Sequence, residues 1–440
     1  MTDLQLVVRG ARLASGEPVD IGVDGGRIAA IEPQIDAAVG AELDAHGLLA
    51  LPGGVDPHVH FNEPGLRSHW EGWATGSAAA AAGGLTTVIE MPLNAHPPTV
   101  DVEAFDAKRA AGERASHVDF GLWGGVVPGN LAQLKPLAQR GVMGFKAFMS
   151  ASGVDDFPTA DAATLYDAMA VIGQLDLPLL VHAEGGELTR TLTERARAAG
   201  RVSMRDYLAT SPAVAEAEAV ARAIELAHAT GCRLHIVHVS TARAVELVLQ
   251  GRAAGVDVTC EVTAHHLLLD EDDAVRLGAV AKCAPPLRPR AEPAHLWELL
   301  NRRAIGFVVS DHSPAPPELK REDDLLDSWG GISGVQSTIE LMLGDERLGA
   351  GLAAEVLAGE AARRFRLAGK GMLAVGADAD IALVQVGHSR TLSVSELRYR
   401  HPQSPYVGRR LTARVRHTLL RGEPVTADAP PRGRFQKPSR

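Results

Sequence analysis

Short runs of apolar and β-branched residues alternate with longer alanine-rich stretches from about residue 50 to residue 370. The apolar runs have the length of buried strands, and the alanine-rich stretches are rich in residues that favour helices. Repeated strand and helix units of this kind indicate an α/β fold, and eight strands predict a closed (β/α)8 TIM barrel. The predicted strands are 51–60, 85–91, 118–127, 142–149, 177–184, 233–239, 256–264 and 305–312. The predicted helices are 73–82, 102–111, 161–174, 213–229, 242–254 and 296–303.

The two ends of the chain have a different pattern. They alternate short strands with turns that contain glycine, proline or aspartate, and they carry no long helical pattern. We therefore expect residues 1–50 and 371–426 to pair into one small β-sandwich-like domain beside a barrel that spans 51–370. Residues 427–440 contain two adjacent prolines and mixed charges, which predicts a flexible tail.

Composition excludes several classes of partner. The 440-residue chain is 46% hydrophobic and 22% charged, which is typical of a folded globular protein. Its net charge of -10 offers no basic stripe for nucleic acid or for an anionic membrane surface, so a small polar substrate is expected. Cys232, Cys260 and Cys283 have no paired spacing, which argues against disulfides and CxxC zinc sites. The N-terminus has no basic segment before an apolar stretch, and no apolar run reaches membrane-spanning length, so we expect a cytoplasmic protein.

Candidate metal ligands stand at the ends of several predicted strands. Two histidines one residue apart on an extended segment point the same way and can bind one ion from the same side. Taken singly, each candidate is more often a hydrogen-bonded core residue, and a lysine in an apolar strand either extends outward or is modified. Together they occupy successive strand ends, which meet at one mouth of a barrel. The set is His58, His60, Lys146, His182, His238 and Asp311.

With these residues in these positions, nearly the whole chain resembles the amidohydrolase superfamily, in the branch of cyclic amidases that holds dihydroorotase, hydantoinase and allantoinase. The resemblance includes Gly-Ala-Asp-Ala-Asp-Ile at 376–381, similar to the family's return into the split β-domain. It implies that Lys146 is carboxylated by carbon dioxide to N6-carboxylysine and bridges two divalent metal ions. His58, His60 and Asp311 then hold one ion, and His182 and His238 hold the other.

The chemistry of such a centre is consistent with these residue types. A lysine carbamate is an anionic oxygen ligand, and two nearby cations offset the cost of burying it. A water between two cations becomes a nucleophile near neutral pH. Asp311 is then placed to act as the catalytic base and afterwards as the acid that protonates the departing ring nitrogen. Zinc suits these ligands, although cobalt, manganese or iron bind similarly.

The ring that such an enzyme opens is indicated by other segments. Dihydroorotases usually carry arginine where this chain has Asn62, and a substrate carboxylate needs such a charged partner. The neutral residue favours an uncharged ring. The segments 60–65, 91–99, 123–130 and 329–334 resemble the allantoinases, which implies that allantoin is opened to allantoate. A hydantoinase or dihydropyrimidinase acting on simpler rings, a dihydroorotase and a non-catalytic scaffold are the alternatives.

Substrate contacts are indicated less directly than metal ligands. By resemblance, Asn94, Ser313, Asn62 and Cys283 with the backbone that follows it face the ring, while the alternative for each is a turn residue that satisfies local backbone groups. Where relatives typically show Cys-Pro-His-Tyr after the seventh strand, this chain has Thr-Ala-His-His at 263–266, and it has Ala315 where allantoinases often carry cysteine. Relatives are commonly tetramers, so a homotetramer is expected.

Overall fold

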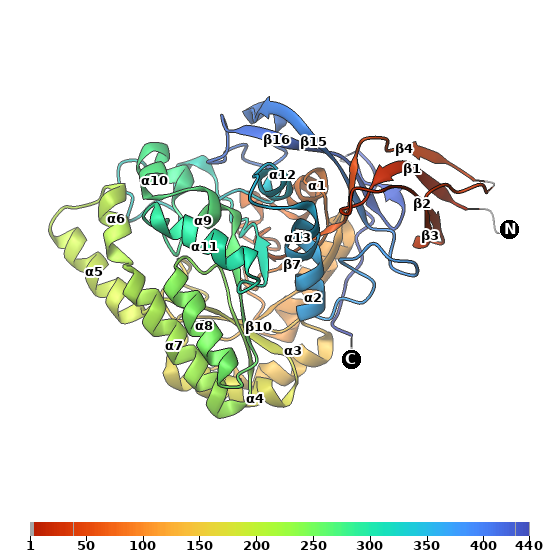
Figure 1. Cartoon of the computed structure of the whole chain (residues 1–440). Helices are drawn as coiled ribbons and strands as arrows, with labels where there is room; N and C mark the ends of the chain where they lie inside the picture. Colours follow the sequence, from red (N-terminus) through yellow and green to blue (C-terminus); the bar gives the residue numbers. More distant parts are fainter. Residues whose placement is uncertain (1–3, 38, 427, 440) are drawn as a thin grey trace.

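The computed structural model describes residues 4–37, 39–426 and 428–439, and its centre is a closed parallel barrel (Figure 1). β8 pairs with β7 while β9 pairs with β10, so these two short strands together occupy one position of the barrel. The barrel closes between its first and last strands, where Val59 bridges His312 and the His60 amide donates to the His312 carbonyl at 2.8 Å. The barrel strands are β6 (Gly54–Val59), β7 (Leu85–Glu90), β8 (Asp119–Leu122), β9 (Gly124–Gly125), β10 (Phe145–Phe148), β11 (Pro178–His182), β12 (Arg233–Ile236), β13 (Val258–Thr263) and β14 (Phe307–Val309).

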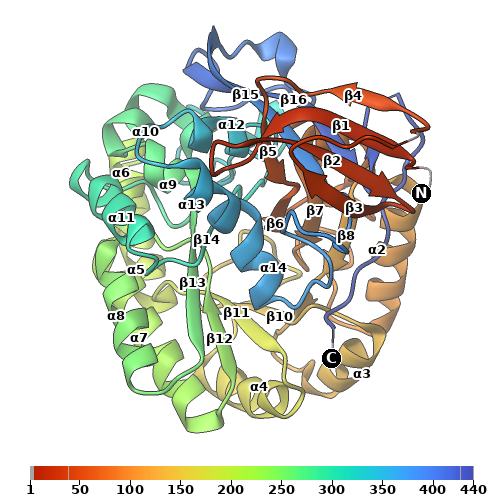
Figure 2. The ribbon, with the colours of Figure 1, turned by 45° about the vertical axis from the view of Figure 1, so that its right-hand side comes forward.

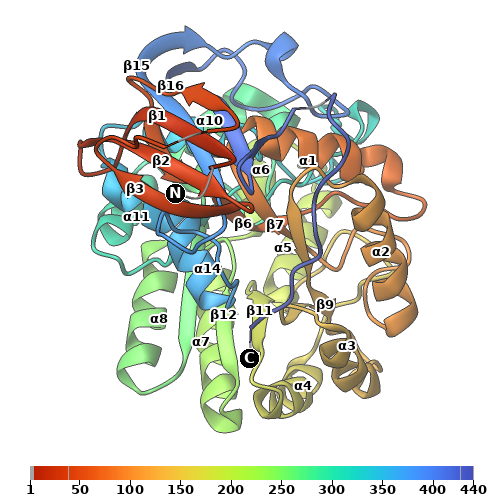
Figure 3. The same cartoon turned by 90° about the vertical axis from the view of Figure 1, so that its right-hand side faces the viewer.

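Helices surround the barrel, and all six predicted helices are present (Figures 1 and 3). Among the helices that follow barrel strands, the sequence pattern missed α3, α5 and α6, because seven-residue helices such as α3 and α6 are too short to show a clear period and α5 buries little of its surface. The helices that follow barrel strands are α1 (Trp73–Ala82), α2 (Val102–Ala115), α3 (Leu134–Arg140), α4 (Ala162–Gln174), α5 (Gly186–Ala198), α6 (Met204–Thr210), α7 (Ala213–Thr230), α8 (Ala242–Ala253) and α11 (Ala291–Asn301). Shorter helices are α9 (Ala264–Leu268), α10 (Glu271–Leu277), α12 (Thr338–Leu343), α13 (Ala350–Ala354) and α14 (Glu360–Arg364).

Alternation along the barrel strands decides which side chains face the interior. On β10, Phe145 and Ala147 belong to the large apolar cluster between strands and helices, so Lys146 faces into the barrel. On β11, Leu180 packs in the separate interior cluster, and His182 lies on the same face two residues later. The same alternation turns Val59 outward and its two neighbouring histidines inward. The structure therefore rejects the alternative that Lys146 extends outward to solvent.

The two chain ends form one β-domain, as predicted (Figure 2). Its sheet runs in the order β17-β16-β15-β5-β1-β2-β3, with β4 paired to β1, so strands from the C-terminal end lie directly beside strands from the N-terminal end. These strands are β1 (Leu6–Arg12), β2 (Pro18–Asp24), β3 (Arg27–Glu32), β4 (Glu42–Asp44), β5 (Leu49–Pro52), β15 (Ile381–Thr391), β16 (Arg410–Leu420) and β17 (Glu423–Pro424).

The strand predicted at 51–60 is two strands. Its first residues belong to β5, which pairs with β15 in the small domain, and the barrel strand β6 begins only at Gly54. The break falls at Gly53, where an added Cβ would lie 2.3 Å from the Thr86 side chain. The apolar run continues through both strands because each is buried, and so the change of sheet leaves no trace in the hydrophobic pattern.

Residues 428–439 differ from the flexible tail expected at 427–440. The Phe120 amide donates to the Arg434 carbonyl at 3.0 Å, and the Gln436 amide donates to the Phe120 carbonyl at 2.7 Å, which adds the segment to the edge of β8. The Phe435 ring packs on Phe105 and Phe120, with centroids 5.9 and 5.8 Å apart. In Figure 3 the chain end runs down the side of the barrel toward its C-terminus, on the side where α2 lies. One aromatic residue among charged neighbours is too little to predict this docking.

Within the described ranges, no helix is long and apolar enough to cross a membrane. Cys232, Cys260 and Cys283 are all buried free thiols.

Candidate metal centre

Three predicted ligands converge at the junction of the first and last barrel strands. His58 Nε2 lies 3.2 Å from Asp311 Oδ1, and His60 Nε2 lies 3.5 Å from the same oxygen. Donor atoms bound to one tetrahedral ion at 2.0 to 2.1 Å are separated from each other by roughly 3.3 Å. The observed separations fit that requirement, so His58, His60 and Asp311 form a candidate metal-binding group.

A second pair of donors lies next to the first group. His182 Nδ1 and His238 Nε2 are 3.0 Å apart, and the His58 and His238 ring centroids are separated by 5.4 Å. The backbone at His238 and Asp311 is left-handed, with φ values of +37° and +44°. Non-glycine residues adopt this conformation rarely, and it concentrates at functional sites. These strand ends therefore turn sharply where the candidate ligands gather.

Lys146 lies near both groups of donors, since its charge, in addition to burial, lowers the pKa of His58 and of His238, and it has an unusual environment. Its side chain is fully buried, and its Nζ has no hydrogen-bond partner among the described residues. Burial lowers the pKa of Lys146 to about 7, which leaves a large fraction of the amine uncharged near neutral pH. An uncharged amine is the form that reacts with carbon dioxide. A buried, unpartnered and readily deprotonated lysine fits a carbamate ligand better than it fits an ordinary core residue.

Hydrogen bonds fix which nitrogen of each histidine faces the centre. Burial, together with nearby Lys146, keeps the pKa of His58 well below its usual value, so this ring is neutral. His58 Nδ1 lies 2.5 Å from Glu261 Oε1, so Nε2 is the nitrogen that faces Asp311. His60 Nδ1 lies 3.3 Å from the Leu93 carbonyl and orients its ring in the same manner.

Glu184 plays the matching part for the second pair. His182 Nε2 lies 2.9 Å from Glu184, which leaves His182 Nδ1 free to face His238. Burial by itself raises the pKa of Glu184, but hydrogen bonds from His182 and Ser211 outweigh burial and hold this pKa below its usual value. The carboxylate is therefore ionised. Neither Glu184 nor Glu261 was predicted from the sequence as part of the site. The sequence signal that could have identified each of them is a charged residue inside or at the end of an otherwise apolar strand.

Replacing Glu261 with Gln should weaken metal binding by about 10- to 100-fold, because an amide cannot become the anionic partner of His58 Nδ1 that a bound cation would favour, and the ring loses its fixed orientation. Metal affinity is measured by competition with a chromogenic chelator. The matched control is Glu225→Gln, since Glu225 is exposed on α7. Equal affinities for the two variants would show that Glu261 does not support the centre.

The predicted substrate contacts separate into two pairs. A cavity of about 60 Å³ is lined by all four candidate histidines, by Asp311, and by Asn94 and Ser313. Asn62 lies behind this lining, where its side-chain oxygen accepts a hydrogen bond from Asn94 at 3.0 Å. Cys283 is also set back, with its carbonyl bound to the Tyr207 hydroxyl at 2.7 Å, and the next residue, Ala284, lines the cavity instead.

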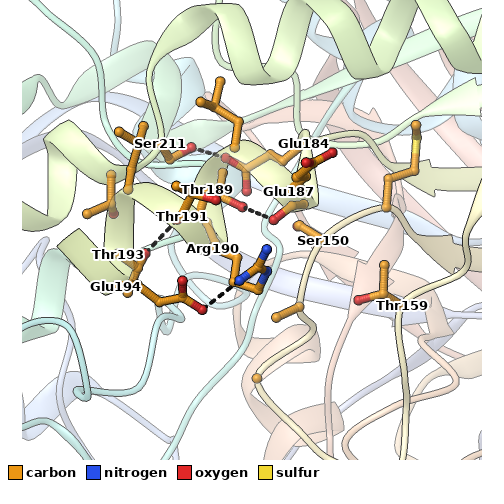
Figure 4. A pocket seen from close by; sticks show the side chains of 18 of the residues that line it. Ser150, Thr159, Glu184, Glu187, Thr189, Arg190, Thr191, Thr193, Glu194 and Ser211 are labelled. Atoms are coloured by element: carbon orange, nitrogen blue, oxygen red, sulfur yellow. Dashed lines mark hydrogen bonds and ion pairs between the residues drawn. The ribbon is translucent and has the colours of Figure 1, made fainter. Parts of the chain in front are cut away.

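A much larger groove of about 1030 Å³ adjoins the cavity, and the two share Ala151 and Ala284 in their linings (Figure 4). Helix α5 and residues 149–162 form its sides. Glu184 and Ser211 lie together within it, while Arg190 and Glu194 pair along α5 at 2.7 Å.

A closed barrel with histidines, a buried lysine and an aspartate at its C-terminal mouth, joined to a β-domain made from both chain ends, is the arrangement of a hydrolase with a candidate metal site. The amidohydrolase family model matches residues 49–425, and the chain belongs to this family. It is 53% identical to an allantoinase from Rubrobacter xylanophilus, over 100% of this chain and 99% of the relative. An allantoinase from Solibacter usitatus is 50% identical over 96% of this chain and 93% of its own length.

Among solved structures, an L-hydantoinase (dihydropyrimidinase) from Arthrobacter aurescens superimposes with a TM-score of 0.94 at 33% identity, covering 99% of this chain and 100% of that structure. The agreement includes the small domain as well as the barrel, because almost all residues of both chains are matched. The likeness to cyclic-amide hydrolases expected from the motifs is therefore confirmed.

Proposed function

We propose that this protein is an allantoinase, which hydrolyses one ring amide bond of allantoin, a hydantoin with a ureido arm, and releases allantoate. The observation that carries the proposal is 53% identity to an allantoinase over essentially the full length of both chains. The cavity is compatible with an uncharged ring, since neither arginine nor lysine contributes to its described lining. A dihydroorotase would need such a cation for the carboxylate of its substrate.

The proposal includes two divalent metal ions, with zinc the best match to histidine, carboxylate and carbamate ligands, and cobalt, manganese or iron as other candidates. His58, His60 and Asp311 would hold one ion, and His182 and His238 the other, with carboxylated Lys146 shared between them. When bound, such cations would lower the pKa of a water ligand and polarise the ring carbonyl. This assignment is supported by the Lys146 amine, which has no hydrogen-bond partner within the described ranges, and by the separations between the donor atoms.

Asp311 is the catalytic residue in this proposal. Its carboxylate lines the cavity beside the donor nitrogens of His58 and His60. It accepts the proton of the attacking water and returns that proton to the ring nitrogen when the carbon–nitrogen bond breaks, so no net proton is gained or lost by the protein. Asn94 and Ser313 would orient the ring, with Asn62 holding Asn94 from behind.

A substrate panel on metal-quantified protein tests the proposed function. We expect kcat/KM for allantoin to exceed that for hydantoin, dihydrouracil and dihydroorotate by about 100-fold, because groups that bind the ureido arm are left unpaired by simpler rings. The second candidate is a hydantoinase, which the TM-score of 0.94 to an L-hydantoinase favours. Preference for hydantoin or dihydrouracil would support this candidate. Metal-loaded protein that leaves allantoin unchanged would overturn the proposal.

We further propose a cytoplasmic homotetramer whose partner is the small-molecule substrate, without nucleic acid or membrane. The net charge of -10 opposes binding to phosphate backbones and anionic lipid. Light scattering of the purified protein should give about four times the 46.3 kDa mass of one chain. The mass of a single chain would contradict the assembly without bearing on the chemistry of the site.

A further inference from the structure

Three loops at the mouth of the barrel meet at one carboxylate, Asp156. Arg67, in the loop after β6, donates to both Asp156 oxygens at 3.1 and 3.0 Å. His96, in the loop after β7, places Nδ1 2.6 Å from Asp156. Asp156 itself lies in residues 149–161 after β10. This arrangement, Arg67 with Asp156 and His96, is referred to as the clasp.

The clasp reaches the substrate cavity on two sides. Arg67 also donates to the Asn94 carbonyl at 3.1 Å, and the Asn94 side chain lines the cavity. On the other side, Ala151 and Ser152 line the cavity from the loop that carries Asp156. The clasp therefore holds the backbone at Asn94 and links it to the segment that contributes Ala151 and Ser152 to the lining.

The loop at 149–161 depends on the clasp more than the other two loops do. The loops after β6 and β7 are joined by their backbones, since the His96 amide donates to the Pro64 carbonyl at 2.9 Å. Gly65 permits this approach, because an added Cβ would collide with the His96 carbonyl. Among the described residues, the hydrogen bonds from 149–161 to these two loops all go to Asp156. Without it, this wall of the cavity would be held to them by packing alone.

The geometry and burial of the clasp give it more strength than an ordinary surface ion pair. The Arg67 and Asp156 side chains are 20% and 21% exposed, and two parallel bonds join them. Partial burial by itself raises the pKa of Asp156, but hydrogen bonds from Arg67 and His96 outweigh burial and hold this pKa below its usual value. The carboxylate is therefore charged throughout the neutral range.

We propose that Asp156 is a positioning residue for the hydrolytic reaction, whose clasp with Arg67 and His96 keeps the mouth loops closed over the substrate cavity and fixes Asn94. This role rests on the proposed function for the identity of the substrate. The candidate metal ligands lie at strand ends rather than on these loops. Loss of the clasp should consequently weaken substrate binding while leaving the metal centre assembled.

The test compares Asp156→Ala with Asp155→Ala, a matched control at the adjacent, exposed aspartate. We expect Asp156→Ala to raise KM for allantoin about tenfold while kcat changes less than about threefold, at unchanged metal content. Hydrogen exchange of the backbone in 149–161 should accelerate in the same variant. Asp155→Ala should match the wild type in both measurements.

A double-mutant cycle distinguishes loss of the clasp from a general loss of stability, because it measures the coupling between Arg67 and Asp156. If the clasp is one unit, adding Asp156→Ala to Arg67→Met should raise KM little beyond the effect of Arg67→Met alone. Independent, multiplying effects would overturn the proposal, as would an Asp156→Ala variant that behaves like the control. Hydrogen exchange needs no substrate, so the clasp is still tested if the wild type fails to open allantoin.

Discussion

Lys146→Ala should lower kcat for allantoin by at least about a thousandfold and release most of the bound metal. The side chain faces the barrel interior near His58 and His238, and its amine is buried without a partner among the described residues. Alanine cannot form the carbamate that would supply anionic oxygen ligands to the metal ions held by the two groups of donors. Metal analysis of the purified variant and steady-state kinetics measure the two effects.

Chemical rescue and a matched control make this result specific. Short carboxylic acids such as acetate or propionate fit the space left by the lysine and should partly restore activity when divalent metal is supplied. Lys135→Ala, at an exposed position on α3, should behave as the wild type. Near-normal activity and metal content in Lys146→Ala would show that the bridging role is wrong.

Asp311→Asn should reduce kcat by about 100- to 10,000-fold, the range expected when a general base and acid is removed. The amide cannot accept the proton of the attacking water, although it keeps nearly the size and shape of the carboxylate. We expect a smaller change in KM, because Asn94 and Ser313 remain in the cavity lining.

The variant must be compared at equal metal occupancy, since Asp311 is also a candidate ligand. Kinetics normalised to measured metal content separate the loss of proton transfer from the loss of the ion. Asp167→Asn, at an exposed position on α4, is the control. If metal-replete Asp311→Asn turns over at the wild-type rate, another group transfers the proton.

Much of the fold was predictable because burial leaves a periodic pattern. The barrel strands are apolar along their length and the helices between them are rich in good helix formers, so both appear in the sequence. The predicted (β/α)8 barrel with a β-domain from both chain ends is confirmed. The change of sheet at Gly53 and the docking of Phe435 were missed, because a continuous buried run and a single aromatic residue do not identify their partners.

For the candidate site, the sequence determined the residue types, their places at strand ends and the shared face of His58 and His60, because side-chain direction alternates along a strand. Tertiary structure alone decided that Lys146 is buried without a partner in the described part of the chain and that Glu261 and Glu184 orient the histidines. It also brought Asp156 to Arg67 from a loop 89 positions away. Such contacts depend on how separate loops and strands approach one another in space, and this information is not contained in the local pattern of any one segment.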